Sequence, residues 1–255
     1  MKQIPKVIHY CWFGGKPIPN DVKKYIESWK KYCPDFEVKE WNEKNFNLAS
    51  CDYVKEASSK KKWAFVSDYA RFWILYNYGG VYFDTDVELI KPIDSILNKG
   101  SFFCCEHGIG NPINPGLGMA APKGLAIYKK ILDSYSNDHF LFSDGTKNEK
   151  TIVTRVTEIL KEDGYKSTWC VERVDNVYIY PPEYFCPLNY DTGKMNITDK
   201  TLAIHHYTAS WHSKLDNFII FMERNKNSKS YGFRRLLTLP FRVVNKFIKI
   251  VESKC

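Results

Sequence analysis

Two aspartates, Asp84 and Asp86, flank one residue directly after an apolar run that ends at Phe83. Side chains two apart on an extended backbone point the same way, so both carboxylates can face one cleft. Like charges that close repel each other unless a cation or a shared proton compensates them. Mg²⁺ or Mn²⁺ bridged to a diphosphate would do so, because hard cations prefer oxygen ligands. The open alternative is a solvated turn after a strand, where aspartate is common.

A third aspartate with an arginine beside it precedes this pair in the sequence. Asp68 and Arg71 lie three residues apart in a stretch of helical periodicity, so they are neighbours on one helix face. By itself the spacing favours a surface ion pair that contributes about 0.2–0.5 kcal/mol. The alternative is a substrate-binding pair, in which the carboxylate accepts from a ribose hydroxyl or a base and the guanidinium holds a phosphate or sugar.

Aromatic and histidine side chains complete the candidate residues. Trp12 ends an apolar run before Gly14, where it could stack on a base at the edge of a sheet or fill the core. His205 and His206 end another apolar run, and adjacent side chains on a strand point to opposite faces. At most one of these histidines therefore joins a site. Trp211, a few residues later, could close over a bound phosphate.

The elements that must position these residues alternate between strand and helix patterns. Strands are predicted at residues 6–13, 36–41, 81–83, 102–105, 177–180 and 202–206. Helices are predicted after residues 19–21, from residue 58 to the glycines at 79 and 80, at 122–134 and at 152–160. A strand, a helix and a strand in the first forty or so residues are typical of a wound α/β sheet.

Composition restricts the class of protein. The 255 residues are 44% hydrophobic and 26% charged, which is typical of a soluble globular domain. No run approaches the roughly 18 apolar residues of a membrane-spanning helix, and the first residues lack the apolar core of a secretion signal. We therefore expect a cytoplasmic protein whose 8 cysteines are reduced. The net charge of +8 favours anionic partners, but residues 224–254 carry half of it or more, so nucleic-acid binding is not expected.

The C-terminal segment differs from the rest of the chain. We predict one domain over residues 1–222 and a basic tail over residues 223–255. From Tyr231 onward apolar residues alternate with arginines and lysines, which predicts an amphipathic helix interrupted at Pro240. Such a helix can lie on an anionic membrane, here the inner face of the cell membrane. The alternative is packing on the domain or on another chain.

Taken in order, several motifs resemble the DXD-containing glycosyltransferases, carbohydrate-active enzyme family 32. They are Ile8 to Gly15, Ser67 to Arg71, Tyr78 to Asp86, His205 to Tyr207, and Ser210 with Trp211. The group includes bacterial capsular and lipopolysaccharide sugar transferases and fungal initiating mannosyltransferases. The resemblance implies a GT-A type α/β domain, with a mixed, mostly parallel sheet flanked by helices.

The resemblance also implies a metal site. Asp84 and Asp86 match the acidic pair that holds Mn²⁺ or Mg²⁺ on the diphosphate of the donor, and His206 would complete the metal shell. Together with Arg71, the two aspartates would be the catalytic residues, because breaking the sugar–oxygen bond leaves negative charge on the diphosphate.

The other matched residues are implied to bind the donor, which is expected to be a UDP-sugar. Cys11 and Trp12 match the strand end that carries the base, with Trp12 stacked on it. Asp68 and Arg71 match contacts to the sugar and ribose, and Trp211 matches a lid over the diphosphate. The implied function is retaining sugar transfer to a glycan or lipid-linked acceptor in bacterial surface polysaccharide synthesis. The alternative is a non-catalytic nucleotide-sugar or glycan binding protein of the same fold.

Overall fold

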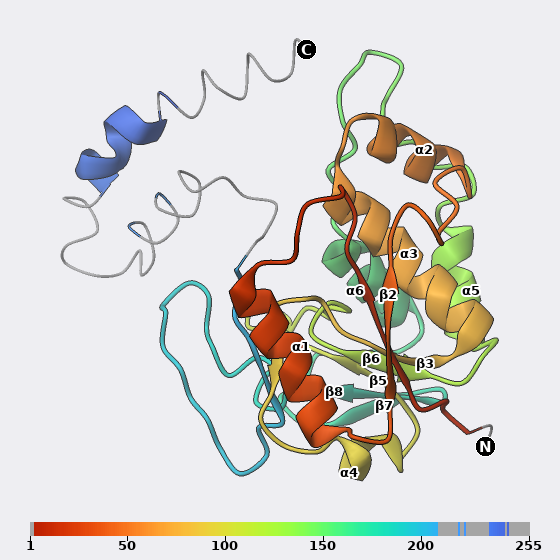
Figure 1. Ribbon diagram of the computed structural model, residues 1–255, viewed down its shortest axis with the longest axis vertical. Helices are drawn as coiled ribbons and strands as arrows, with labels where there is room; N and C mark the ends of the chain where they lie inside the picture. The colour runs from red at the N-terminus through yellow and green to blue at the C-terminus, as the bar shows by residue number, and fades with distance from the viewer. Residues whose placement is uncertain (1–2, 209–218, 220–221, 223–234, 243, 245–255) are drawn as a thin grey trace. The chain divides into compact units, whose positions relative to one another are not determined.

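The computed structural model describes residues 3–208, 219, 222, 235–242 and 244. The chain divides into two compact units, Met1–Pro187 with Asn196–His206, and Leu188–Met195 with Tyr207–Cys255. The helices and strands labelled in Figure 1 belong to the first unit. Within the described residues, no helix combines the length and the apolar character needed to cross a membrane.

A mixed sheet of seven strands forms the centre of the first unit in the described part of the chain (Figure 1). Its strands are β1 (Val7–Cys11), β2 (Glu37–Trp41), β3 (Gly80–Tyr82), β5 (Ser101–Cys104), β6 (Met119–Ala121), β7 (Glu172–Val174) and β8 (Val177–Tyr180). Their order is β2-β1-β3-β6-β5-β8-β7. β1 runs parallel to β2 and β3, and β5 runs parallel to β8, whereas β6 and β7 are antiparallel to their neighbours. Most strands therefore point one way, which confirms the expected mixed, mostly parallel sheet.

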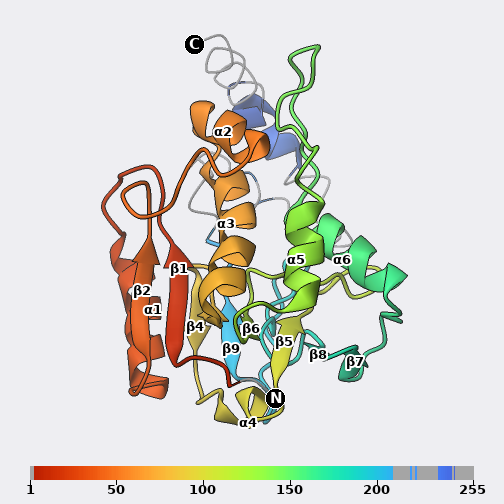
Figure 2. The same cartoon turned by 90° about the vertical axis from the view of Figure 1, so that its right-hand side faces the viewer.

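Helices cover both faces of this sheet (Figures 1 and 2). They are α1 (Asn20–Tyr32), α2 (Asp52–Ser59), α3 (Trp63–Tyr78), α4 (Asp94–Leu97), α5 (Ala126–Asp133) and α6 (Ile152–Glu162). Side chains alternate along β1, so Tyr10 meets Trp29 of α1 while Cys11 packs into the core shared with α3 and α5. A ribbon of β4 (Val87–Leu89) and β9 (Ala203–His205) lies beside α1.

Most predicted elements are present, and the differences have local causes. The helix expected from residue 58 begins only at Trp63, as α3, and a helix that was not expected, α2, precedes it; the two separate at Lys61, whose φ is +54°. The last expected strand pairs with β4 in the ribbon rather than with the central sheet. In the C-terminal unit, residues 235–242 are helical and Pro240 stands inside the helix instead of interrupting it. A proline inside a helix removes one backbone hydrogen bond, and this helix continues past it.

The entry of β3 is built around two glycines. Gly79 ends α3 with φ +70°, and a Cβ on Gly80 would lie 2.6 Å from the carbonyl oxygen of Val7. The buried ring of His9 bridges this turn: Nε2 donates to the Gly79 carbonyl at 3.0 Å, while Nδ1 accepts from Trp41 Nε1 at 3.0 Å. The close packing fixes one end of β3, and Asp84 follows at its other end.

Candidate active site

α3 and β3 together hold a buried charged cluster at the carboxyl end of β3. The guanidinium of Arg71 contacts Asp68 Oδ1 at 2.9 Å and Asp84 Oδ1 at 3.2 Å. The hydroxyl of Tyr82 donates to the same Asp84 oxygen at 3.0 Å. Asp68 and Arg71 lie one turn apart on α3, and Tyr82 precedes Asp84 by two residues, so local geometry directs each pair to one side. The structure therefore brings the predicted Asp68, Arg71 and Asp84 together.

Burial makes this cluster different from a surface ion pair. The side chain of Arg71 is 4% exposed, which excludes the surface alternative for Asp68 and Arg71. Burial acts against the charge of Arg71, but Asp84, Tyr82 and Asp68 raise its pKa above the ordinary value. Burial raises the pKa of Asp68 to about 6, although Arg71 acts in the opposite direction. The carboxylate of Asp68 is therefore costly to keep ionised.

Asp86 lies in the turn between β3 and β4 and is 9% exposed. Its Oδ1 is 3.1 Å from Nε2 of the buried His205. Burial would lower the pKa of His205, but the charge and hydrogen bond of Asp86 raise it above the usual value, which favours the imidazolium. The sequence had singled out one of two adjacent histidines, and the histidine that meets the acidic pair is His205.

His206, expected as the third metal ligand, has a different environment. Its Nε2 lies 2.8 Å from Glu88 Oε2, and its ring stacks on Tyr25 at 4.5 Å. Only its backbone N–H reaches the acidic pair, by donating to the carbonyl of Asp86 at 2.9 Å. Adjacent residues on a strand alternate in direction, so His205 and His206 cannot both face the carboxylates. The imidazole of His206 is turned to the α1 side.

Cys11 and Trp12, which are expected to contact the nucleotide base of the donor, lie at the end of β1. The thiol of Cys11 is buried beside Tyr82 and Ser67, and burial raises its pKa to about 12. Trp12 is half-buried, and its indole N–H donates to the carbonyl of Lys16 at 2.6 Å. Among the described contacts, Cys11 joins the charged cluster and Trp12 does not. Trp211, the expected lid, lies outside the described residues.

A glycine that the sequence did not single out shapes the space next to Asp84. Both side-chain contacts described for Asp84 are made by Oδ1. A Cβ on Gly116 would collide with the other oxygen, Oδ2, so only glycine leaves room there. The Gly116 carbonyl also accepts from the Asp84 backbone N–H at 2.9 Å. Oδ2 therefore packs against the Gly116 backbone, where a side chain would displace it.

Within the described residues, no group of three or more histidine, cysteine, aspartate or glutamate side chains is arranged to hold a metal ion. Asp84 and Asp86 could still supply two oxygen ligands, and Mg²⁺ is often bound through one or two carboxylates together with substrate phosphates and water. The residues present therefore fit a cation that is shared with a diphosphate.

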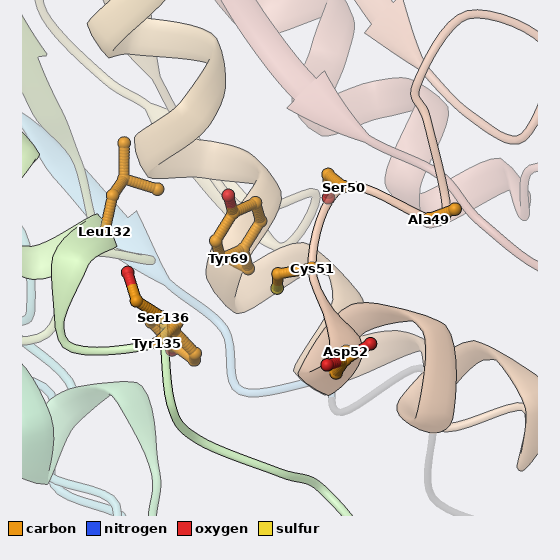
Figure 3. A pocket seen from close by; sticks show the side chains of 8 residues that line it. All are labelled: Ala49, Ser50, Cys51, Asp52, Tyr69, Leu132, Tyr135 and Ser136. Carbon is orange, nitrogen blue, oxygen red and sulfur yellow. The ribbon is translucent and has the colours of Figure 1, made fainter.

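A pocket of about 360 Å³ lies elsewhere on α3, where α2 begins and α5 ends (Figure 3). Its lining residues are Ala49, Ser50, Cys51, Asp52, Tyr69, Leu132, Tyr135 and Ser136. None of the predicted site residues lines it, so the candidate site is the loop edge around Asp84 rather than this pocket.

Comparisons with known proteins agree with the fold and the motif. The mixed α/β sheet flanked by helices is a GT-A-like fold, which is found in glycosyltransferase structures. Residues 19–103 match the family described as "Glycosyltransferase sugar-binding region containing DXD motif". The match confirms the resemblance to DXD-containing glycosyltransferases and includes Asp68, Arg71, Asp84 and Asp86.

Two relatives and one solved structure illustrate the similarity. The chain is 28% identical to an uncharacterised glycosyltransferase of Acanthamoeba polyphaga mimivirus, over 86% of this chain and 88% of the relative. It is 32% identical to inositol phosphoceramide mannosyltransferase 1 of Schizosaccharomyces pombe, over 40% of this chain and 34% of that protein. The structure of the PaToxG glycosyltransferase superposes with a TM-score of 0.51 at 20% identity, covering 64% of this chain and 71% of that one. At that identity the superposition shows the fold alone.

Proposed function

We propose that this chain is a metal-dependent, retaining glycosyltransferase that moves a sugar from a nucleotide-sugar donor, of the UDP type, to an acceptor hydroxyl. The observation that carries the proposal is the convergence of Arg71, Tyr82 and Gly116 on Asp84, with Asp86 two residues away. A pure binding protein has no need of a cation at the leaving group, whereas sugar transfer benefits from one.

Asp84 and Asp86 would hold Mn²⁺ or Mg²⁺ together with the donor diphosphate. The bound cation would stabilise the negative charge that develops on the diphosphate as it leaves. Arg71 and Tyr82 hold Asp84 by its Oδ1, and Oδ2 lies against the Gly116 backbone. His205 likewise holds Asp86 by its Oδ1. Because the ring of His206 is bonded to Glu88, we assign the remaining ligand positions to the diphosphate and water.

The donor would be held by residues of β1 and α3. We assign Asp68 and Arg71 to the sugar and ribose, Cys11 and Trp12 to the base, and Trp211 to the diphosphate, as the resemblance implies. No residue is assigned as a covalent nucleophile. An oxygen of the leaving diphosphate would take the proton of the acceptor hydroxyl, which enters on the face that the diphosphate leaves. The sugar then keeps its anomeric configuration.

A panel of nucleotide-sugars with Mn²⁺, scored by release of sugar to water, tests this proposal without knowledge of the acceptor. We expect one donor to be hydrolysed, hydrolysis to stop with a chelator, and Asp86→Asn to lower the rate by about 10³-fold. Asp133→Asn is the matched control, because Asp133 lies in an exposed ion pair with Lys129 on α5. Metal-dependent hydrolysis by Asp86→Asn at a near-normal rate would contradict the proposed role of the acidic pair. Tight donor binding without hydrolysis or transfer would favour the binding protein.

The acceptor is proposed to be a glycan or a lipid-linked glycan. The name of the yeast relative, an inositol phosphoceramide mannosyltransferase, supports a lipid-borne acceptor. A role in bacterial surface polysaccharide synthesis rests on the resemblance alone, since the relatives described above come from a virus and a yeast.

We also propose that the C-terminal tail attaches the protein to an anionic membrane surface. In its described part, Leu236, Leu237, Leu239 and Phe241 are exposed on a helix that also carries Arg235 and Arg242. Such a helix can insert its apolar side chains while its arginines meet lipid headgroups.

Flotation with phosphatidylserine vesicles tests the attachment. We expect the wild-type protein to float, and the double variant Arg235→Glu with Arg242→Glu to lose most of this binding. The double variant Lys44→Glu with Lys60→Glu makes the same charge change in the first unit and should still float. Equal flotation of both double variants would rule out attachment through the tail.

A further inference from the structure

An exposed aromatic and aliphatic group lies on two loops near the carboxyl edge of the sheet. Trp169 is 66% exposed, Ile109 is fully exposed, and Val171 is 38% exposed. The ring of His107 lies 6.4 Å from the ring of Trp169. We call Trp169, His107 and Ile109 the platform. A tryptophan this exposed, grouped with other apolar atoms, is more typical of a contact surface than of a core.

The two loops of the platform are fastened to each other. Asn111 is buried, and its side-chain amide donates to the carbonyls of Ser167 at 3.1 Å and Thr168 at 3.0 Å. In return the hydroxyl of Tyr165 donates to the Asn111 carbonyl at 2.7 Å. Asn111 and Ser167 both have positive φ, which the tight crossing of the loops requires. A surface that is ordered before binding loses little conformational entropy when a ligand arrives.

A chain of hydrogen bonds joins the platform to the acidic pair. Glu106, which precedes His107, accepts from the side-chain amide of Asn114 at 2.7 Å. Asn114 Oδ1 accepts from the Gly116 N–H at 2.8 Å, and the Gly116 carbonyl accepts from the Asp84 N–H at 2.9 Å. The negative charge of Glu106 also acts on His205, the partner of Asp86. Glu106, the residue before His107 of the platform, is therefore connected to the candidate active site.

Topology agrees with this placement. β3 and β5 point the same way in the sheet, so Asp84 and Glu106 follow strand ends at one edge. Trp169 lies in the connection from α6 to β7, and β7 is the last strand of the sheet (Figure 2). The loops of the platform and the acidic pair therefore lie at the same edge of the sheet.

We propose that the platform holds a sugar ring of the acceptor glycan, with Trp169 stacked on the ring face and Glu106 accepting a hydrogen bond from one of its hydroxyls. The proposal rests on the proposed transferase function. A sugar ring suits this surface because it pairs an apolar face with hydroxyls at its rim, and tryptophan offers a large rigid apolar face. The ammonium of Lys161, on α6, lies near Gly110, which is in the same loop as Ile109. It can donate a hydrogen bond to a further sugar hydroxyl.

Saturation-transfer NMR with the methyl glycosides of glucose, galactose, mannose and N-acetylglucosamine, at millimolar concentration, tests binding without donor or metal. We expect wild-type protein to bind at least one glycoside, Trp169→Ala to bind it about tenfold more weakly, and Trp169→Phe to recover most of the affinity. Ile109→Ala should weaken binding, whereas Ile197→Ala, which truncates another exposed isoleucine of the first unit, should not.

Turnover separates this proposal from the transferase function. With a hydrolysed donor and the bound glycoside, Trp169→Ala should lower the ratio of sugar transferred to the glycoside over sugar released to water by about tenfold. An unchanged ratio, or no binding of any glycoside by wild-type protein, would overturn the platform. Concentration-dependent self-association that Trp169→Ala abolishes, or vesicle binding that it abolishes, would assign the surface to a second copy or to lipid instead. Absence of any donor hydrolysis would contradict the transferase function, while glycoside binding would still decide the platform.

Discussion

The two ends of β3 carry two buried polar clusters that differ in charge. At the Gly80 end, both ring nitrogens of the neutral His9 are bonded, one to the Gly79 carbonyl and one to Trp41. At the other end, Arg71 is shared by Asp68 and Asp84. The first cluster is closed within the chain and has no charge, and it anchors the strand. The second concentrates charge that stabilises the fold poorly by itself.

The second cluster also brings several acidic side chains together. Its acidic members and their acidic neighbours are Asp68, Asp84, Asp86 and Glu106, which lie with Arg71 and with His205, whose pKa Asp86 raises. Carboxylate oxygens grouped in this way suit a hard cation. The difference between the two ends therefore separates a cluster that supports the fold from one that is suited to a cation and a diphosphate.

The largest expected effect follows from removing the guanidinium of Arg71 from the charged cluster. Arg71→Met would leave Asp68 and Asp84 buried without their guanidinium, which should lower the free energy of unfolding by about 3–5 kcal/mol. Donor hydrolysis should fall by two orders of magnitude or more, about the effect of losing one electrostatic contact in an active site. Urea unfolding and the hydrolysis assay measure the two effects. Arg173→Met is the control, because Arg173 is exposed on β7, and it should change neither quantity appreciably. A change in the free energy of unfolding below about 1 kcal/mol, close to what surface substitutions cause, would show that the stability of the cluster does not depend on Arg71.

The stability of the protein at acidic pH tests whether the cluster around His9 is neutral. Burial lowers the pKa of His9 from 6.5 to about 4, and a hydrogen bond to Gly79 opposes this only in part. A depressed folded-state pKa means that the contribution of His9 is complete above pH 6.5 and is lost as the pH falls toward 4, because the unfolded chain binds the proton first. Relative to His9→Gln, the wild-type protein should lose about 3 kcal/mol of unfolding free energy between pH 7 and 4. Parallel pH profiles of the two proteins in urea unfolding would mean that His9 is not held neutral.

The sequence predicted the residues at the strand ends better than the contacts that these residues make with distant parts of the chain. The helical spacing of Asp68 and Arg71, the stop at Gly79 and the position of Asp84 are local features, so their arrangement follows from helix and strand geometry. The choice between His205 and His206 depends on β9 pairing with β4, a contact between residues far apart in sequence. Gly116 and Asn111 carry no local signal, because their importance comes from loops that meet only in the folded chain. The three-residue strands β4, β6 and β7 were not predicted, although β3 and β9, which have the same length, were.

The smallest expected effect is a gain in stability at the charged end. Burial raises the folded-state pKa of Asp68 from 3.8 to about 6, so its ionised form costs free energy above pH 6 and this cost disappears below about pH 4. Asp68→Asn should therefore raise the free energy of unfolding by about 1–2 kcal/mol at pH 7.5, with no gain at pH 4. Donor affinity should fall at the same time, because a carboxylate accepts hydroxyl hydrogen bonds more strongly than an amide. Asp133→Asn, an exposed control, should change neither. If Asp68→Asn is instead less stable than wild type at pH 7.5, the attraction of Arg71 outweighs the burial of Asp68, and the charged end supports the fold as the neutral end does.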